Sequence, residues 1–327
     1  MADSSPVVEL SRPPANNGGP ARAAVDGEGA PGRGRELDRG RRRTGILLAL
    51  PAAVLVGGLL VFPIAEATYY SFTSWNGETA HFVGFSSYSQ LLFHTTAIRQ
   101  IFQNNLAVVL SIPVGLFFAL IAAFVTSLRV PGWRPFRFIV FLPVALSWVV
   151  IGIIFSNFLT PGQGIDSLLS GVGLHSIALD WLGSTHTALP ALLATFNWAL
   201  FGINTVIFMT GLASIPPEIV EAARVDGAGF FTILRHIVMP LLGRFVRLAF
   251  LVTMISGFSG MFGLIYVMTA GGPGFSTTTL EFQIYQSAFT LGNFGQAAAL
   301  GIFLLLIMLT VTLIINMIGR RKSADLW

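Results

Sequence analysis

Residues 101–126 read IFQNNLAVVLSIPVGLFFALIAAFVT, a largely apolar stretch with no ionisable side chain. About 20 helical residues cross the ~30 Å hydrocarbon core of a bilayer, so the stretch predicts a transmembrane helix. Backbone groups cannot stay unpaired in lipid, and runs of this length fit helices rather than the shorter strands of a barrel. The stretch therefore indicates an all-α membrane protein.

Five further stretches along the chain have a similar length and character. Together the six predicted spans lie near residues 45–72, 101–126, 137–158, 187–212, 245–269 and 292–318. Only 10% of the 327 residues are charged, against about 25% in a typical soluble domain. This composition excludes an ordinary cytosolic enzyme. The absence of cysteine excludes a disulfide scaffold, thiol catalysis and thiolate metal sites.

The first 43 residues differ from the rest of the chain. They hold eight of the 19 basic residues, six of the 15 acidic residues, seven Gly and five Pro, with almost no apolar run. Such a segment cannot bury enough surface to offset its ordering entropy, so residues 1–43 are predicted to be a disordered tail. Its acidic and basic residues alternate, which argues against a nucleic-acid partner. Residues 44–327 form the predicted transmembrane domain.

The basic residues predict the orientation in the membrane. Eighteen of the 19 flank the predicted spans on one side, and the exception is Arg99. Cytoplasmic loops carry an excess of Lys and Arg, so both termini are expected in the cytoplasm of a cell whose plasma membrane holds the chain.

The first span has an alternative interpretation as a cleaved signal peptide. Arg41 to Arg43 precede an apolar run, and Ala65-Glu66-Ala67 resembles a cleavage site. The run is about 20 residues long, whereas the apolar region of a signal peptide has about 7–15. We therefore expect an uncleaved span, and the mass of the mature chain decides between the two.

The predicted spans contain very few ionisable residues. Apart from Arg137 at the edge of the third span, four of the six contain none, although ion-coupled carriers usually need intramembrane carboxylates or histidines. The only lysine is Lys322, so the chain has no phosphate-binding loop of the G-x-x-x-x-G-K type. The five histidines are scattered and indicate no metal site or embedded enzyme. We expect a non-catalytic chain without a cofactor. It either lets a solute move passively or takes the energy for transport from a partner.

The longest predicted cytoplasmic loop, about 213–243, carries the most informative local pattern. Residues 215–229 read IPPEIVEAARVDGAG, which predicts a short helix with Pro216 and Pro217 at its start. Glu218 and Glu221 lie near the positive end of the helix dipole, and Gly227 suits a left-handed stop. An apolar stripe then predicts a second helix that packs on the spans: Phe230, Ile233, Leu234, Ile237 and Leu241. These signals alone also fit an ordinary inter-helix loop.

The stretch EAARVDGAGFFTILRHIVMP at 221–240 resembles the EAA signature of permease subunits of bacterial ABC importers of the maltose/carbohydrate type. The matching positions are Glu221, Ala222, Ala223, Asp226, Gly227, Ala228, Ile237 and Pro240. The family often has Phe where Leu234 stands and Pro where Arg244 stands, so these departures concern the packing of the second helix. Residues 271–295 also resemble an outer loop of maltose-type permeases, and the likeness covers residues 45–320.

The resemblance implies a pore-forming subunit and its partners. It implies a second homologous permease subunit, two ABC ATPase subunits that bind ATP and Mg²⁺, and an extracytoplasmic sugar-binding protein. It also implies that the short helix between spans four and five is a coupling helix that sits in a cleft of the ATPase. Its expected coupling residues are Glu221, Ala222, Ala223, Asp226, Gly227, Ala228 and Pro240.

An uncharged pathway fits a neutral sugar, because aromatic faces and neutral hydrogen-bonding groups can hold one. The candidate pathway residues in spans four and five are Asn197, Trp198, Asn204, Ser256, Phe258, Ser259 and Tyr266. Each of them equally fits a helix–helix contact, since polar groups in lipid seek partners in either case. The alternatives left open are a permease for another small solute, such as glycerol phosphate, and a stand-alone carrier or facilitator.

Overall fold

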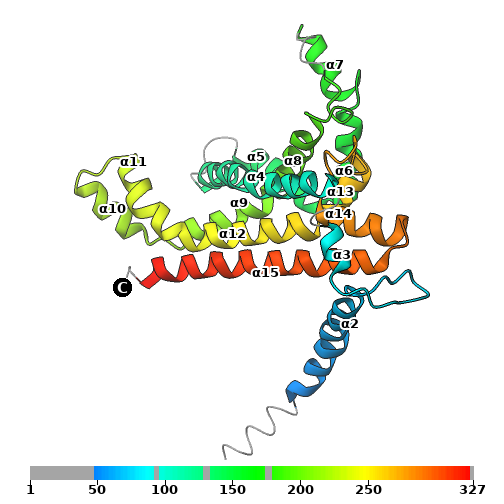
Figure 1. Cartoon of the computed structure of the whole chain (residues 1–327). Helices are drawn as coiled ribbons and strands as arrows, with labels where there is room; N and C mark the ends of the chain where they lie inside the picture. Colours follow the sequence, from blue (N-terminus) through cyan, green and yellow to red (C-terminus); the bar gives the residue numbers. More distant parts are fainter. Residues whose placement is uncertain (1–47, 92–95, 128–132, 174–178, 325–327) are drawn as a thin grey trace, which may run out of the picture. The chain divides into compact units, whose positions relative to one another are not determined.

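A computed structural model describes residues 48–91, 96–127, 133–173 and 179–324, and every regular element within them is a helix. One isolated bridge joins Thr73 to Phe82. The predicted tail, residues 1–43, lies outside the described residues. The elements in Figure 1 are α2 (Phe62–Tyr70), α3 (Ser86–Ser89), α4 (Thr96–Ser127), α5 (Trp133–Phe141), η3 (Leu142–Ala145), α6 (Trp148–Phe158), α7 (Gly164–Gly171), α8 (Ala188–Ala199), α9 (Phe201–Ala213), α10 (Pro217–Val225), α11 (Phe230–Ile233), η5 (Leu234–Val238), α12 (Met239–Ser259), α13 (Phe262–Met268), α14 (Leu280–Tyr285), η6 (Gln286–Thr290) and α15 (Phe294–Ala324).

The chain divides into two units, Met1–Leu60 and Val61–Trp327, and each is described by itself. Of the first unit the structure describes residues 48–60, which are helical throughout and carry a π-helical turn from Gly57. Their large side chains are exposed, as expected of a lipid-facing helix.

The described residues contain up to six candidate membrane spans, in agreement with the predicted number. Four are single helices, and two are pairs of helices that count as one span each although they are bent. The single helices are Leu48–Tyr70, Ala97–Ser127, Phe231–Ser259 and Phe294–Met317, and the bent pairs are Pro135–Ala145 with Trp148–Phe158 and Ala188–Ala199 with Phe201–Ala213.

The bends are not apparent from the apolar runs. The third span turns by 111° because Leu146 is extended and Ser147 starts a new helix, its hydroxyl accepting from the Val150 amide at 3.3 Å. The fourth span bends by 46° next to Gly202. A Cβ at Gly202 would lie 2.6 Å from the Val140 carbonyl oxygen, so only glycine permits this approach between α5 and α9.

The fifth span begins at Phe231, earlier than the predicted residue 245, and ends at Ser259. The second helix of the loop is therefore the first part of this span rather than a separate element. The π-helical turn η5 lies within it and shifts the side-chain register. As a result Leu241 of the predicted stripe is 44% exposed, whereas Val238 and Leu242 are buried.

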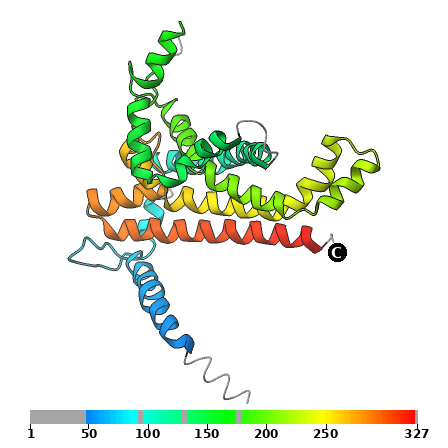
Figure 2. The ribbon, with the colours of Figure 1, turned by 180° about the vertical axis from the view of Figure 1, so that it is seen from behind.

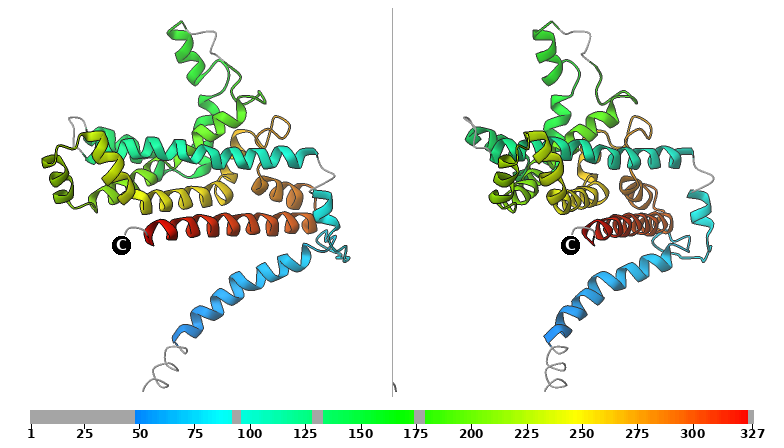
Figure 3. Two further views of the ribbon diagram at one scale, coloured as in Figure 1. Left: turned by 60° about the vertical axis from the view of Figure 1, so that its left-hand side comes forward. Right: turned by 90° about the vertical axis from the view of Figure 1, so that its left-hand side faces the viewer.

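The centre of the second unit is a bundle in which α4 packs against α9 and α12. Helices α12 and α15 run side by side along its length (Figure 2). The views in Figure 3 show α4 alongside them, with α10 at one end of the bundle and the start of α15 at the other. A second core of side chains joins α6, α8 and α13. The end that carries α10 is called the α10 end, and the opposite end, where α14 packs against α15, is called the α14 end.

Candidate coupling helix and transport pathway

Helix α10 begins as the sequence predicts. Pro216 is the N-cap residue and Pro217 the first helical residue, where the missing N–H leaves no hydrogen bond unmade. Glu218 lies in the first turn and Arg224 in the last, so both charges complement the helix dipole. The local sequence thus stabilises a helix of only nine residues.

The end of α10 is a Schellman motif. The Ala228 amide donates to the Ala223 carbonyl at 2.9 Å, and the Gly227 amide donates to the Arg224 carbonyl at 3.0 Å. Gly227 has a φ of +83°, the left-handed conformation that residues with a Cβ avoid. This confirms the predicted stop at Gly227 and gives the glycine a geometric role.

The predicted coupling residues lie on two faces of α10 and the turn after it. Val220, Ala223 and Ala228 pack against the buried cluster of Ile233, Val238 and Leu242. Glu221, Ala222, Asp226 and Gly227 are exposed, and so is Pro240 on the next helix. Val225 is 87% exposed, an unusual position for a large apolar side chain. The inner residues fix α10 to the bundle, and the outer ones form an open surface.

Arg244, where the sequence departs from the EAA pattern, ties the start of α12 to the end of α9. Its guanidinium donates to the Ser214 hydroxyl at 3.2 Å and lies 4.8 Å from the centre of the Phe245 ring. Gly211 lies beneath Leu242 and Phe245, where a Cβ would approach both side chains to less than 3 Å. The two helices that flank α10 are therefore tightly joined.

The two asparagines predicted for the pathway make inter-helix contacts. Asn204 and Thr253 exchange hydrogen bonds of 2.9 and 3.2 Å between α9 and α12, and both are buried. Asn197 donates to the Ser111 hydroxyl at 3.1 Å and to the Leu193 carbonyl at 2.8 Å. Trp198, next to it, contacts the Phe155 ring at 5.1 Å.

The four candidates on α12 and α13 differ in accessibility. Phe258 is buried in the central core, and Ser256 is half-buried. Ser259 is exposed but donates to the Ile255 carbonyl of its own helix at 2.7 Å. Tyr266 is 51% exposed. The structure thus does not gather the seven candidates into one pocket.

Asn104, which the sequence analysis did not single out, connects α4 to a distant loop. Its side-chain amide donates to the Phe275 and Thr278 carbonyls, both at 2.8 Å, and accepts from Gln100 at 3.0 Å. The residue is fully buried. An amide inside an apolar span is the only sequence signal of this role, and it does not reveal the partner 171 residues away.

The segment 269–279 between α13 and α14 is held by its own hydroxyl groups. The Thr277 and Thr278 hydroxyls donate to the Gly272 and Gly271 carbonyls, each at 2.9 Å. Thr279 then caps α14 by accepting from the Phe282 amide at 3.4 Å. With Asn104, these bonds give the segment a fixed path across the α14 end.

Glu281 on α14 lies outside the candidate spans and has a perturbed pKa. Burial of its carboxyl group raises the pKa from 4.5 to about 7, although a hydrogen bond from the Phe262 amide acts in the opposite direction. Its Oε2 atom is buried and has no hydrogen-bond partner among the described residues. The folded chain therefore favours the neutral acid.

A test of this carboxyl group is the pH dependence of stability. Below pH ~4.5 the Glu281 carboxyl group is neutral in both the folded and the unfolded chain. As the pH rises to about 7, the carboxyl group ionises in the unfolded chain before it does so in the folded chain. The free energy of unfolding therefore falls by about 3 kcal/mol over this range. In Glu281→Gln this loss is expected to disappear. The thermal unfolding temperature in detergent at pH 5 and pH 8 measures it, and an equal change in both proteins would contradict the assignment.

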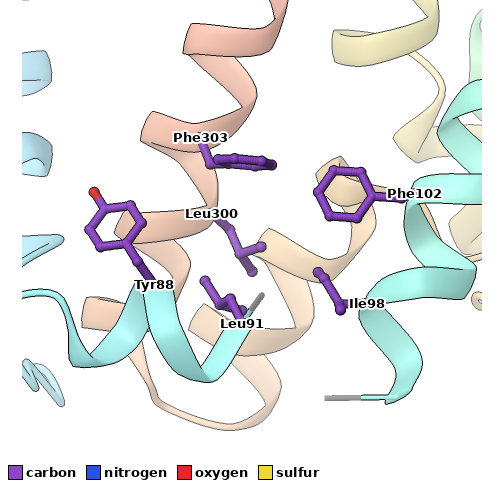
Figure 4. A pocket seen from close by; sticks show the side chains of 6 residues that line it. All are labelled: Tyr88, Leu91, Ile98, Phe102, Leu300 and Phe303. Carbon is purple, nitrogen blue, oxygen red and sulfur yellow. The ribbon is translucent and has the colours of Figure 1, made fainter. Parts of the chain in front are cut away.

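The described cavity between α3, α4 and α15 is apolar. Figure 4 shows its lining side chains, Tyr88, Leu91, Ile98, Phe102, Leu300 and Phe303. The one polar group among them, the Tyr88 hydroxyl, already donates to the Ser71 hydroxyl at 2.7 Å. The cavity therefore offers nothing to a polar solute.

These features define a class of protein. The second unit is a helical bundle with apolar spans, a bent third and fourth span, and a short capped helix exposed at one end. No group of three or more metal-binding side chains occurs within the described residues. The chain is a multi-pass α-helical membrane protein.

The comparison with family models identifies it further. Residues 111–324 match the model described as "Binding-protein-dependent transport system inner membrane component". The matched region covers α10 and most of the spans. The chain belongs to this family and is a membrane permease of the ABC transporter type.

Individual relatives agree with the family. A probable ABC transporter permease of Pyrococcus horikoshii is 33% identical over 82% of this chain and 92% of its own length. A sulfoquinovosyl glycerol transport system permease of Agrobacterium fabrum is 31% identical over 91% of this chain and 97% of its own. A solved bacterial ABC transporter involved in the import of the acidic polysaccharide alginate matches with a TM-score of 0.74 over 88% of this chain and 99% of that chain, at 21% identity, which shows the fold alone.

Proposed function

We propose that the chain is a pore-forming, non-catalytic subunit of an ATP-driven importer that translocates a saccharide. Membership of the family supports the importer, and the transport of a glycoside by the Agrobacterium relative supports the solute class. The observation that carries the proposal is α10, a short helix that begins at Pro217, ends in a Schellman motif and has an exposed outer face between the fourth and fifth spans. Such a helix is suited to transmit a movement between two proteins.

The proposed orientation puts α10 and both termini in the cytoplasm of a bacterial cell. Arg224, Arg235 and Arg244 lie toward the α10 end, as the excess of basic residues in cytoplasmic loops requires. Glu281 lies on α14, and Asp166 and Asp180 lie in the connection between the third and fourth spans. The α14 end then faces outward, toward a binding protein that delivers the solute.

Labelling of single cysteines tests this orientation, because the chain has no cysteine of its own. Val225→Cys on α10 and Val172→Cys after α7 replace residues that are 87% and 73% exposed. A membrane-impermeant maleimide is expected to label Val172→Cys in intact cells, and Val225→Cys only after the cells are opened. Labelling of Val225→Cys in intact cells would reverse the orientation.

In the proposed mechanism two ATPase subunits bind the α10 end. These partner subunits bind ATP with Mg²⁺ and hydrolyse it. Closure of the ATPase pair moves α10, and its packing on Ile233, Val238 and Leu242 passes the movement to the fifth span. The Arg244–Ser214 hydrogen bond carries the fourth span with it. A second homologous permease subunit completes the pore.

The solute is proposed to be a neutral saccharide. Arg99 and Arg137 lie near the start of their helices, and Arg235, Arg244 and Arg247 lie between residues 235 and 247 of the fifth span. The candidate pathway residues themselves are uncharged, which favours a neutral saccharide over an anionic solute such as glycerol phosphate. Asn197, Trp198, Asn204, Ser256, Phe258, Ser259 and Tyr266 remain the proposed pathway residues. If Asn197→Ala with Trp198→Ala leaves the uptake rate and selectivity unchanged, this part of the pathway is wrong.

Reconstitution tests the function. The complex purified with this chain is placed in proteoliposomes with its binding protein outside and ATP inside. Radiolabelled maltose, cellobiose, sulfoquinovosyl glycerol and glycerol 3-phosphate are then offered. We expect ATP-dependent uptake of maltose or cellobiose and none of the two anions, sulfoquinovosyl glycerol and glycerol 3-phosphate. Uptake without ATP would indicate a stand-alone carrier. Uptake of sulfoquinovosyl glycerol would refute the neutral charge of the solute, and uptake of glycerol 3-phosphate alone would refute the saccharide.

A further inference from the structure

Six aromatic side chains form an unbroken row at the α14 end. The row runs Tyr266, Tyr285, Phe289, Phe294, Trp75 and Tyr70, with successive ring centres 5.8, 5.4, 6.2, 5.2 and 4.1 Å apart. We call this row the aromatic strip. Its members come from α13, α14, η6, α15, the segment after α2, and α2 itself. Separate parts of the chain therefore converge to build it, at the end that Figure 3 shows away from α10.

The aromatic strip is accessible rather than part of the core. Phe289 is 73% exposed and Tyr266 is 51% exposed, and the other four rings are half-buried. The hydroxyl groups of Tyr266 and Tyr285 make no hydrogen bond to another described residue. Open ring faces and free hydroxyls thus occur side by side.

The aromatic strip also carries polar groups. Tyr266 and Tyr285 are adjacent in it, with ring centres 5.8 Å apart, so two hydroxyl groups lie beside open ring surface. Gln283 Oε1 and Glu281 Oε2 on α14 are buried, so they take no part in binding from outside.

A saccharide satisfies both features. The C–H face of a sugar ring packs on an aromatic ring, and its hydroxyl groups can exchange hydrogen bonds with the Tyr266 and Tyr285 hydroxyl groups. Binding sites for small molecules typically combine aromatic walls with a few polar groups in this way. We propose that the aromatic strip binds the saccharide at the outer mouth of the permease, before it enters the pore. This inference rests on the proposed function.

The test separates rings from mere apolar bulk. Tyr266→Leu with Phe289→Leu removes the two open rings, Tyr266→Phe with Phe289→Tyr keeps both, and Leu291→Ala changes an apolar side chain that is 67% exposed beside the strip. In proteoliposomes, uptake of the glycoside that the wild-type complex imports fastest from the panel above is expected to fall about tenfold in the leucine pair only.

A second measurement in the same vesicles excludes other occupants. Stimulation of ATPase activity by the loaded binding protein is expected to stay at the wild-type level in the leucine pair, since docking of that protein does not use the rings. A parallel loss of stimulation would show that the strip contacts the binding protein instead. Wild-type uptake in the leucine pair, or equal losses in both pairs, would also overturn the proposal.

Failure of the proposed function is recognised separately. It appears as a wild-type complex that imports no glycoside of the panel, and then the strip has no saccharide to bind. Failure of the aromatic-strip proposal alone appears when the wild-type complex does import a glycoside but the variants do not differ from it in the expected way.

Discussion

Replacement of Gly227 by Asp or Pro is expected to abolish solute uptake while the chain still inserts into the membrane. Gly227 has a φ of +83°, which Pro cannot adopt because its ring fixes φ near −65°. A residue with a Cβ in this region costs about 1–2 kcal/mol. No atom lies within 4 Å of the position where a Cβ would stand, so the effect comes from the backbone and not from a clash.

So large an effect is expected because the turn at Gly227 sets the orientation of α10 relative to the bundle. Loss of the left-handed turn breaks the Schellman hydrogen bonds to Ala223 and Arg224, and α10 no longer leaves the bundle at the angle that a rigid partner requires. Uptake in membranes with equal amounts of protein, together with ATPase activity of the purified complex, measures the outcome. We expect near-complete loss of uptake and ATPase activity that no longer responds to the binding protein.

Gly229→Asp is the matched control for Gly227→Asp. Gly229 lies two residues further on in the same turn, its φ is not positive, and a Cβ there meets no atom within 4 Å. Asp at position 229 adds the same charge as Asp at position 227 but no backbone strain, so uptake is expected to stay near the wild-type level. Undiminished uptake in Gly227→Asp would defeat the coupling-helix assignment.

Asn104→Leu is expected to give the second largest effect, on stability. The substitution keeps the approximate volume but removes the donor to the Phe275 and Thr278 carbonyls, two acceptors of the 269–279 segment. Buried groups that lose a partner cost about 1–3 kcal/mol each, so a loss of about 2 kcal/mol or more follows. Thermal unfolding in detergent and limited proteolysis of the segment between α13 and α14 measure it.

The neighbouring residue supplies the control for this substitution. Asn105 is also buried, but its side chain donates only to the Ile101 carbonyl of its own helix at 2.8 Å. Asn105→Leu therefore frees no group of another element and should cost less than Asn104→Leu. If the two variants unfold alike and the segment stays protected in both, Asn104 does not hold it.

The parts of the fold that depend on local composition could be predicted from the sequence. The number of spans follows from apolar runs, and α10 with its stop at Gly227 follows from the proline, acid and glycine positions. The bend next to Gly202 could not be predicted, because it depends on the close approach of α5 to α9. The bend at Leu146 has a local cause, the extended Leu146 and the N-cap Ser147, but the continuous apolar run hides it. The π-helical turn at Leu234–Val238 could not be predicted either, because an apolar stripe of period 3.6 assumes an uninterrupted α-helix.

The candidate site divides in the same way. The coupling residues form one continuous pattern, so a sequence motif finds them, although their role stays a prediction. Polar residues in spans carry no sign of what they contact: Asn204 is paired with Thr253, whereas Tyr266 is open and belongs to the aromatic strip. Such pairings arise only when the helices pack.

The central claim is that α10 docks into an ATPase, and a site-specific cross-link tests it most directly. Because the chain has no cysteine, Val225→Cys gives a single attachment point on the outer face of α10. The variant is treated in native membranes with a short cysteine-to-amine cross-linker, and the product is identified by mass spectrometry. We expect a product with a Walker-motif ATPase from Val225→Cys and none from Val172→Cys. The absence of that product in membranes that still import the solute, or its formation from Val172→Cys, would contradict the account.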